Sequence, residues 1–151
     1  MSKPQDSKKM FSVQLLREIR ENIGGSIPFD EKDIKRLAKD AFSNACHRGN
    51  REIVELLLDH GVPIDTPFEN GMTGLSWASN NGHVSVVKLL LDRGADKRKV
   101  DDEGKTPLDH ARIHVKNLQD DHAREYDERH YSYNEYQSLL SIFSQIIKLL
   151  E

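Results

Sequence analysis

Apolar residues recur at helical spacing in the middle of this chain. Val86, Val87 and Leu90 fall on one side of a helix predicted for about residues 83–93. A shorter helix is predicted before it, because the hydroxyl of Thr73 can accept hydrogen bonds from backbone N–H groups two or three residues on. Gly82 can end this first helix in the left-handed conformation. The pattern therefore predicts a pair of short helices whose apolar faces need a neighbour.

The same pattern recurs along the chain at a fixed distance of 33 residues. The paired positions are Ala45 and Ala78, Gly49 and Gly82, Leu56–58 and Leu89–91, Gly61 and Gly94, then Gly71 and Gly104, Thr73 and Thr106, Leu75 and Leu108, Ala78 and Ala111. One helix pair cannot bury its own apolar face, whereas stacked copies can, so the repeat predicts an all-α solenoid.

Residues 69–96 and 102–111 resemble ankyrin repeats. The features that carry the resemblance are the period, the Thr-Pro-Leu helix start at 106–108, the Gly-His pair at 82–83 and the Leu-Leu-Leu followed by Gly-Ala. The resemblance covers roughly residues 36–114 and returns at 143–151. It implies antiparallel helix pairs that are joined by β-turn fingers and stacked into a curved slab.

Three repeats are expected, at about residues 36–67, 68–100 and 101–151. The third is interrupted, because residues 145–150 resemble residues 85–90 at a distance of 60 rather than 33. We infer an insertion at about residues 115–141 that lengthens both helices into an extended C-terminal hairpin. The last helix is expected to begin near Asn134, with the tip of the hairpin at residues 127–133.

An N-terminal helical cap is expected at residues 10–35, after a disordered tail at residues 1–9. Residues 10–23 predict an amphipathic helix, and Gly24 and Gly25 end it. Asp30 can cap a further helix. Terminal repeats need a cover over their apolar end, although a partner-binding role for the first helix is the alternative. The apolar stripe of the first helix is Phe11, Leu15, Ile19 and Ile23, and the side chains expected to point inward from the second are Ile34, Leu37, Ala38, Ala41 and Phe42.

The second repeat departs from the usual ankyrin pattern at two positions. Gly74 stands where the family usually has Pro, and Trp77 where it usually has Leu. We expect a looser helix start at Gly74 and a Trp77 ring that must find room between helices.

Candidate catalytic and metal-binding groups are few. His110 and His114 are four residues apart on one predicted helix, a spacing that can chelate a metal, but the Glu of the metalloprotease motif is absent. Cys46 and His47 are adjacent, so their side chains diverge on a helix, and Cys46 is expected to fill the core. We therefore expect no catalytic residue, no metal and no cofactor.

Composition excludes several other functions. The formal net charge is −3 over 151 residues, so no global basic field favours nucleic acid. The sequence contains no run of 18 apolar residues, so no membrane span is predicted. The N-terminus does not resemble a secretory signal. A single Cys suits a reducing compartment, which predicts a cytoplasmic protein.

The resemblance implies a non-enzymatic module that binds a protein partner, as an adaptor or inhibitor, through finger tips and the concave face. The positions that carry over are Glu69, Asn70, Met72, Trp77, Asn80, Asn81, Asp102, Glu103, Lys105, Ile113 and His114. Tyrosines of the inserted segment are candidate interface residues because Tyr is favoured at interfaces: Tyr126, Tyr131 and Tyr133. Two alternatives are an effector acting in a host cytosol and a metal-dependent enzyme using the inserted histidines. A monomer or weak dimer is expected.

Overall fold

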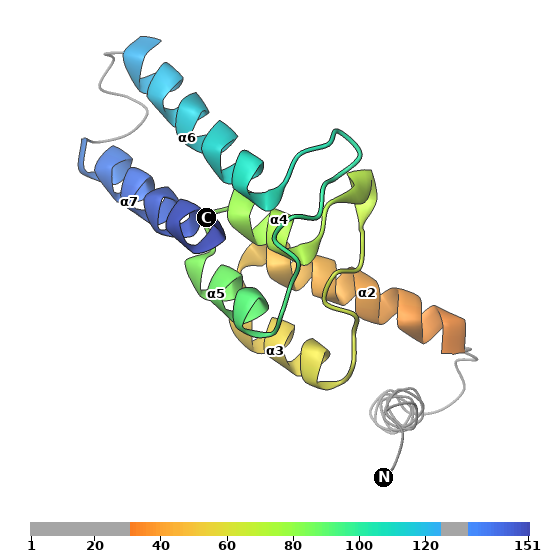
Figure 1. Cartoon of the computed structure of the whole chain (residues 1–151). Coiled ribbons are helices and arrows are strands. Elements are labelled where there is room, and N and C mark those ends of the chain that lie inside the picture. The colour runs from red at the N-terminus through yellow and green to blue at the C-terminus, as the bar shows by residue number, and fades with distance from the viewer. Residues whose placement is uncertain (1–30, 125–132) are drawn as a thin grey trace.

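The computed structural model describes residues 31–124 and 133–151 (Figure 1). This part of the chain contains six α-helices, one short 3₁₀ turn and no β-strand. The elements are α2 (Glu31–Arg48), α3 (Arg51–Asp59), η1 (Glu69–Gly71), α4 (Gly74–Asn80), α5 (Val84–Asp92), α6 (Pro107–Arg124) and α7 (Tyr133–Leu150).

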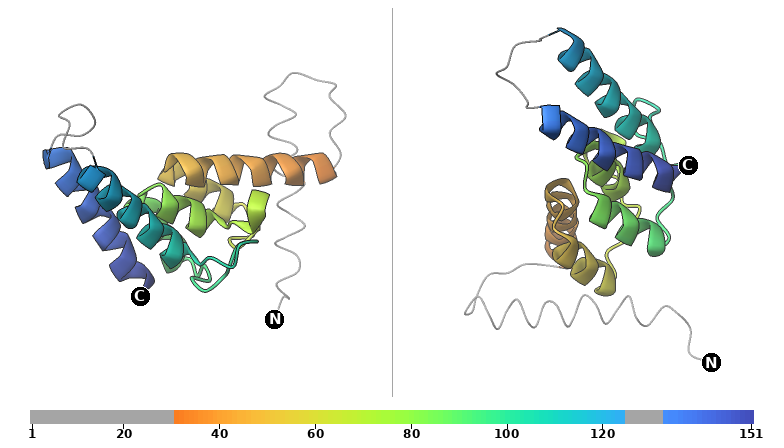
Figure 2. Two further views of the ribbon diagram at one scale, coloured as in Figure 1. Left: turned by 90° about the horizontal axis from the view of Figure 1, so that it is seen from above. Right: turned by 90° about the vertical axis from the view of Figure 1, so that its left-hand side faces the viewer.

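The helices stack in three layers of two. Each layer pairs one helix of an inner row, α2, α4 or α6, with the following helix of an outer row, α3, α5 or α7. Within each row, successive helices pack side by side, as the views in Figures 1 and 2 show. The predicted all-α solenoid of stacked helix pairs is confirmed.

The second layer follows the predicted helix limits closely. Thr73 caps α4, and its hydroxyl accepts a hydrogen bond of 3.3 Å from the backbone N–H of Ser76. Helix α5 is flanked by His83 and Arg93, where the apolar pattern placed its ends. Gly82 adopts a φ of 77°, a left-handed conformation that suits glycine and lets the chain reverse between α4 and α5.

The third layer carries the interruption. Helices α6 and α7 each have 18 residues, against seven in α4 and nine in α5. Ile146 and Leu150 of α7 are buried like Val86 and Leu90 of α5, and α7 packs beside α5. The register of 60 residues is therefore confirmed. The predicted insertion spans the second half of α6 and the first half of α7, and most of its expected tip lies outside the described residues.

Consecutive layers are joined where an aromatic ring lies over a glycine. The His83 ring covers Gly49 so closely that a Cβ on Gly49 would come within 2.5 Å of it, and His83 Nε2 donates to the carbonyl of His47 at 2.8 Å. Phe143 stands 60 residues after His83 and also lies over Gly82, less tightly: a Cβ at that position would be 3.4 Å from its ring and 3.3 Å from Ile142. Between the second and third layers, the apolar ring of Phe143 therefore takes the place that the hydrogen-bonding ring of His83 has between the first and second layers.

Helix α2 carries the predicted inward side chains, with two exceptions. It runs from Glu31 to Arg48, so the helix expected after Asp30 continues through the start of the first repeat near residue 36. Ile34, Ala38 and Phe42 are buried as predicted, and they follow a spacing of four residues. The prediction was wrong for Leu37 and Ala41, which are exposed because they lie beside that line.

The glycine at the start of α4 permits a tight contact rather than a loose one. A Cβ on Gly74 would lie 2.8 Å from Cys46 Sγ and 3.1 Å from Phe42 Cε1, both on α2. The missing side chain therefore lets α2 approach α4. Cys46 fills the core at this contact, and burial raises the pKa of its thiol to about 12.

We expect Gly74→Ala to destabilise the fold, although alanine favours a helix by up to about 1 kcal/mol over glycine. Overpacking against Cys46 and Phe42 costs roughly 1–3 kcal/mol, and urea denaturation followed by circular dichroism measures the balance. Adding Cys46→Ala removes the nearer atom and should restore part of the loss. Equal or higher stability of Gly74→Ala would contradict the tight contact.

Candidate partner-binding surface

The two fingers between layers are held in register by backbone contacts. In the first, Phe68 N–H donates to the Met72 carbonyl at 2.9 Å, and Asn70 and Gly71 turn the chain with φ of 59° and 72°. In the second, Asp101 N–H donates to the Lys105 carbonyl at 3.0 Å. Asp102 N–H donates to the Asn70 carbonyl at 3.0 Å, which ties the tips together.

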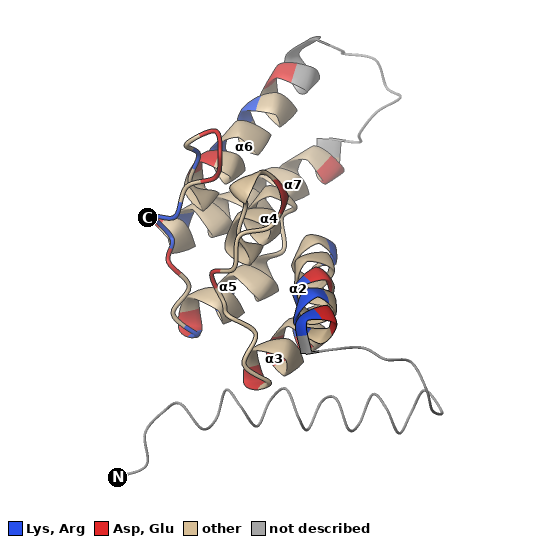
Figure 3. Ribbon diagram, turned by 90° about the vertical axis from the view of Figure 1, so that its right-hand side faces the viewer, with Lys and Arg blue, Asp and Glu red and all other residues tan. Residues whose placement is uncertain are grey.

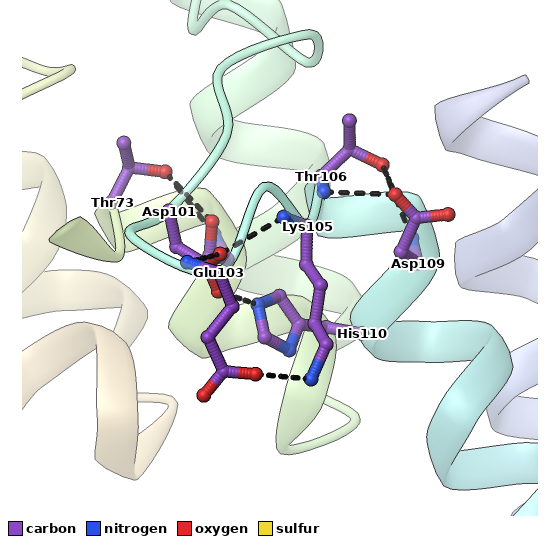
Figure 4. A network of polar contacts seen from close by, with 8 residues as sticks. Thr73, Asp101, Glu103, Lys105, Thr106, Asp109 and His110 are labelled. Atoms are coloured by element: carbon purple, nitrogen blue, oxygen red, sulfur yellow. Dashed lines mark hydrogen bonds and ion pairs between the residues drawn. The ribbon is translucent and has the colours of Figure 1, made fainter. Parts of the chain in front are cut away.

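Asp101 organises the second finger from its buried base (Figure 4). Its Oδ1 accepts the backbone N–H groups of Glu103 and Lys105, both at 2.9 Å. Its Oδ2 lies 2.7 Å from Nε2 of His110, which must donate because a carboxylate only accepts. One side chain therefore anchors the finger to the first turn of α6.

These contacts also set the ionisation of Asp101. Burial by itself would raise the pKa of this carboxyl, but the hydrogen bonds from Lys105 N–H, His110 and Glu103 N–H stabilise the charged form more strongly. The net effect lowers the pKa of Asp101 below its usual 3.8. Asp101 therefore stays ionised, and acceptor-only, across the neutral range.

The start of α6 is fixed beside this network. Thr106 N–H donates to Asp109 Oδ2 at 2.9 Å, and Asp109 N–H donates to Thr106 Oγ1 at 3.2 Å. This is a reciprocal capping box with Asp in place of Glu. The hydrogen bond from the Thr106 side chain is the main reason that the pKa of Asp109 is lowered.

The bases of the loops are tied to the outer row. Asp65 accepts the backbone N–H of Asp96 at 3.1 Å, and Arg93 reaches back to Asp59 at 2.6 Å and Glu55 at 3.0 Å. Each contact joins one layer to the next. The finger tips therefore stand on a base that is braced on both rows.

Most of the predicted contact residues remain accessible. Those that are exposed are Glu69, Asn70, Asp102, Glu103 and Ile113. Those that are half-buried are Trp77, Asn80, Asn81, Lys105 and His114. The exposed tips carry three carboxylates, and Lys105 forms an ion pair with Glu103, so the tips present an acidic surface. Figure 3 shows acidic residues on the finger before α6, and mixed charges along α2.

Met72 does not belong to the accessible surface. It was expected to face a partner, but it is only 7% exposed and its side chain packs inward at the base of the first finger. Lys105 holds the same position in the second finger and is only half-buried, so the burial of Met72 reflects its apolar side chain and its neighbours rather than its place in the finger.

Trp77 lies between the inner helices. Its ring meets the His47 ring edge-on, with centroids 5.0 Å apart, and its Nε1 is buried without a hydrogen-bond partner among the described residues. Asn81 donates to the Trp77 carbonyl at 2.8 Å. The large ring thus finds its room against α2, and only part of it faces solvent.

The two histidines with chelating spacing have separate partners. His110 bonds to Asp101, whereas His114 stacks on Phe143 with centroids 4.2 Å apart and 18° between the planes. Burial lowers the pKa of His114. Among the side chains that the structure describes, no group of three His, Cys, Asp or Glu lies close enough together to hold a metal. The side chains of His122 and His130 lie outside the described residues.

The candidate tyrosines fall at the edge of the described chain. Tyr126 and Tyr131 lie outside it, and Tyr133 is present only as the first residue of α7.

Two features of the structure were not predicted from the sequence. The role of Asp101 was missed because no repeat copy marks it, and the exposure of Ile53 and Leu56 was missed because both match buried positions of α5.

A sequence model of ankyrin repeats (3 copies) matches residues 13–101 and 42–120, which is more than half of the chain. Together with the layered helix pairs, this shows that the chain belongs to the ankyrin-repeat family. Ankyrin repeats form protein–protein interaction modules and are typically non-enzymatic. No helix among the described residues is long and apolar enough to cross a membrane.

Two named relatives share part of the chain. Residues of this chain are 43% identical over 74 positions to the ankyrin repeat, SAM and basic leucine zipper domain-containing protein 1 of Ovis aries, covering 49% of this chain and 14% of that protein. The protein of the same name in Bos taurus is 43% identical over 64 positions, 42% of this chain and 12% of that protein. The match thus spans only a small part of either relative.

We expect Asp101→Ala to destabilise the protein by about 2–4 kcal/mol at neutral pH, because two backbone donors and His110 lose their acceptor. Since the folded-state pKa is depressed, this stability is fully present above 3.8 and is lost as the pH falls through the lower folded value. Urea denaturation of both proteins at pH 7 and at pH 3 checks this. The difference in free energy of unfolding between wild type and Asp101→Ala should be smaller at pH 3 than at pH 7. An equal difference at both pH values would contradict the role given to the ionised Asp101.

Proposed function

We propose that this chain acts as an adaptor or inhibitor that binds one protein partner through its finger tips and the adjoining inner-helix surface. The observation that carries the proposal is the rigid support of the tips. The bond between Asp102 and Asn70 and the buried carboxylate of Asp101 fix the backbone, while the side chains at the tips stay exposed. Little ordering entropy is then lost when a partner binds.

The charge of the tips favours a partner with a basic surface. Glu69, Asp102 and Glu103 project from two neighbouring fingers, with Lys105 paired to one of them. Ile113 of α6 adds an exposed apolar side chain in the inner row. A central apolar contact beside a charged rim is the usual composition of a transient interface. Complementary charge at the rim would raise the rate of association and set its salt dependence.

A matched pair of charge reversals tests this surface. A partner is first captured with the intact protein and then titrated against Asp102→Lys and Asp92→Lys. Asp102 is exposed on the second finger, whereas Asp92 is exposed at the end of α5 in the outer row. We expect Asp102→Lys to weaken binding about tenfold, or about 1.4 kcal/mol, and Asp92→Lys to leave it unchanged.

Circular dichroism and urea midpoints of the two variants control for damage to the fold. Raising the salt concentration should weaken binding of the wild type and have less effect on Asp102→Lys. Equal affinities of the two variants, with both folded, would place the partner on another surface.

A further inference from the structure

The outer row repeats its apolar positions, but their burial differs sharply between layers. Val86, Leu89 and Ile146 are 0%, 3% and 0% exposed. The equivalent side chains on α3, Ile53 and Leu56, are 43% and 56% exposed. The position of Ile53 is thus core in the second and third layers and surface in the first, whereas the position of Leu56 is core in the second layer and half-buried in the third, at Leu149.

The difference follows from what precedes each helix. Helix α5 packs beside α3, and α7 packs beside α5, so their apolar positions are covered by the layer before. Helix α3 begins the described outer row. Two large apolar side chains one helical turn apart form a patch of the kind that other protein surface normally covers.

The opposite end of the row is finished differently. Toward α5, α3 presents Arg51, which donates to the Ser85 carbonyl at 3.1 Å, and Glu55, which pairs with Arg93. The positions of α7 that correspond to Arg51 and Glu55 are Ser144 and Lys148, both polar and exposed. At these two outer-row positions the last layer therefore faces solvent with polar groups, whereas the first described layer exposes Ile53 and Leu56.

The chain itself carries a segment that fits this face. Residues 11–23 place Phe11, Leu15, Ile19 and Ile23 along one side of a helix of about 20 Å. The match to ankyrin repeats begins at residue 13, so it includes most of this segment. Residues 24–30 then connect this segment to α2. When extended, this connector can span roughly 23 Å. Helix α2, with 18 residues, is about 27 Å long, so the connector is nearly as long as the helix.

We propose that residues 11–23 form a helix that packs its apolar stripe on Ile53 and Leu56, and so add a layer to the array ahead of α2 and α3. Buried in this way, the two side chains would match Val86 and Leu89 of the next layer. The proposal is independent of the finger surface, which lies on the other row of loops and helices.

Cysteine pairs in the full chain test the contact and its partner. Leu56→Cys is combined with Leu15→Cys, with Ile19→Cys, or with the control Arg17→Cys, which lies between them on the opposite side of the predicted helix. The native Cys46 is buried and its thiol pKa is about 12, so it reacts slowly. Dilute protein is oxidised, and the disulfides are mapped by mass spectrometry.

We expect an intramolecular disulfide from Leu15→Cys or Ile19→Cys to form at least tenfold faster than from Arg17→Cys. Equal rates for all three pairs would overturn the proposal. Disulfides that form only between two chains would also overturn it, since a second copy of the protein would then cover the face.

A second measurement uses no thiols. Leu15→Glu should lower the urea midpoint and raise the binding of an apolar dye, because it exposes Ile53 and Leu56 while the three layers stay folded. Arg17→Glu introduces the same side chain on the opposite side of the predicted helix, so it should leave the urea midpoint and the dye binding unchanged. Identical midpoints for the two variants would show that the segment does not cover α3.

Discussion

The structure depends on one constraint, that the apolar side of every helix pair is buried only by the pair beside it. Layer follows layer because Val86 and Leu89 need α3, and Ile146 needs α5, to leave water. The short helix α4 shows the constraint most strongly. It lies between two helices of 18 residues, and Gly74, Ser76, Ala78 and Ser79 are all small and buried there.

Close approach of the inner helices explains much of the rest. Because Gly74 has no side chain, the ring of Phe42 and the thiol of Cys46 fill the space that a Cβ there would occupy. This packing also sets a short separation between the two fingers, so a single backbone hydrogen bond from Asp102 N–H to the Asn70 carbonyl can join them. Packing in the core thus determines the spacing of the two fingers that form the proposed binding surface.

Periodicity predicted the stacked pairs, the ends of α5 and the displaced copy in α7, since each depends on local apolar spacing that repeats. Other features depend on contacts between segments far apart in the chain. Gly74 was expected to loosen the start of a helix. Its tight contact with Cys46 could not be predicted, because the two residues are far apart in the sequence and come close only in the folded chain. The burial of Met72 and the role of Asp101 depend on how one finger lies against the next. Exposure of Leu37 and Ala41 was decided by which side of a long helix faces α3 and α4.

The displaced copy in the third layer has a thermodynamic consequence. Residues that pack together across α5 and α7 are 60 positions apart instead of 33, which is nearly a doubling of the chain to be closed. Loop-closure entropy rises only with the logarithm of length, so this doubling costs about 0.6 kcal/mol. Phe143 on Gly82 and the stacked ring of His114 lie at the point where the extra chain rejoins the array. An ankyrin array can therefore gain a long excursion between the two helices of one layer at little expense, provided that the returning helix arrives in register.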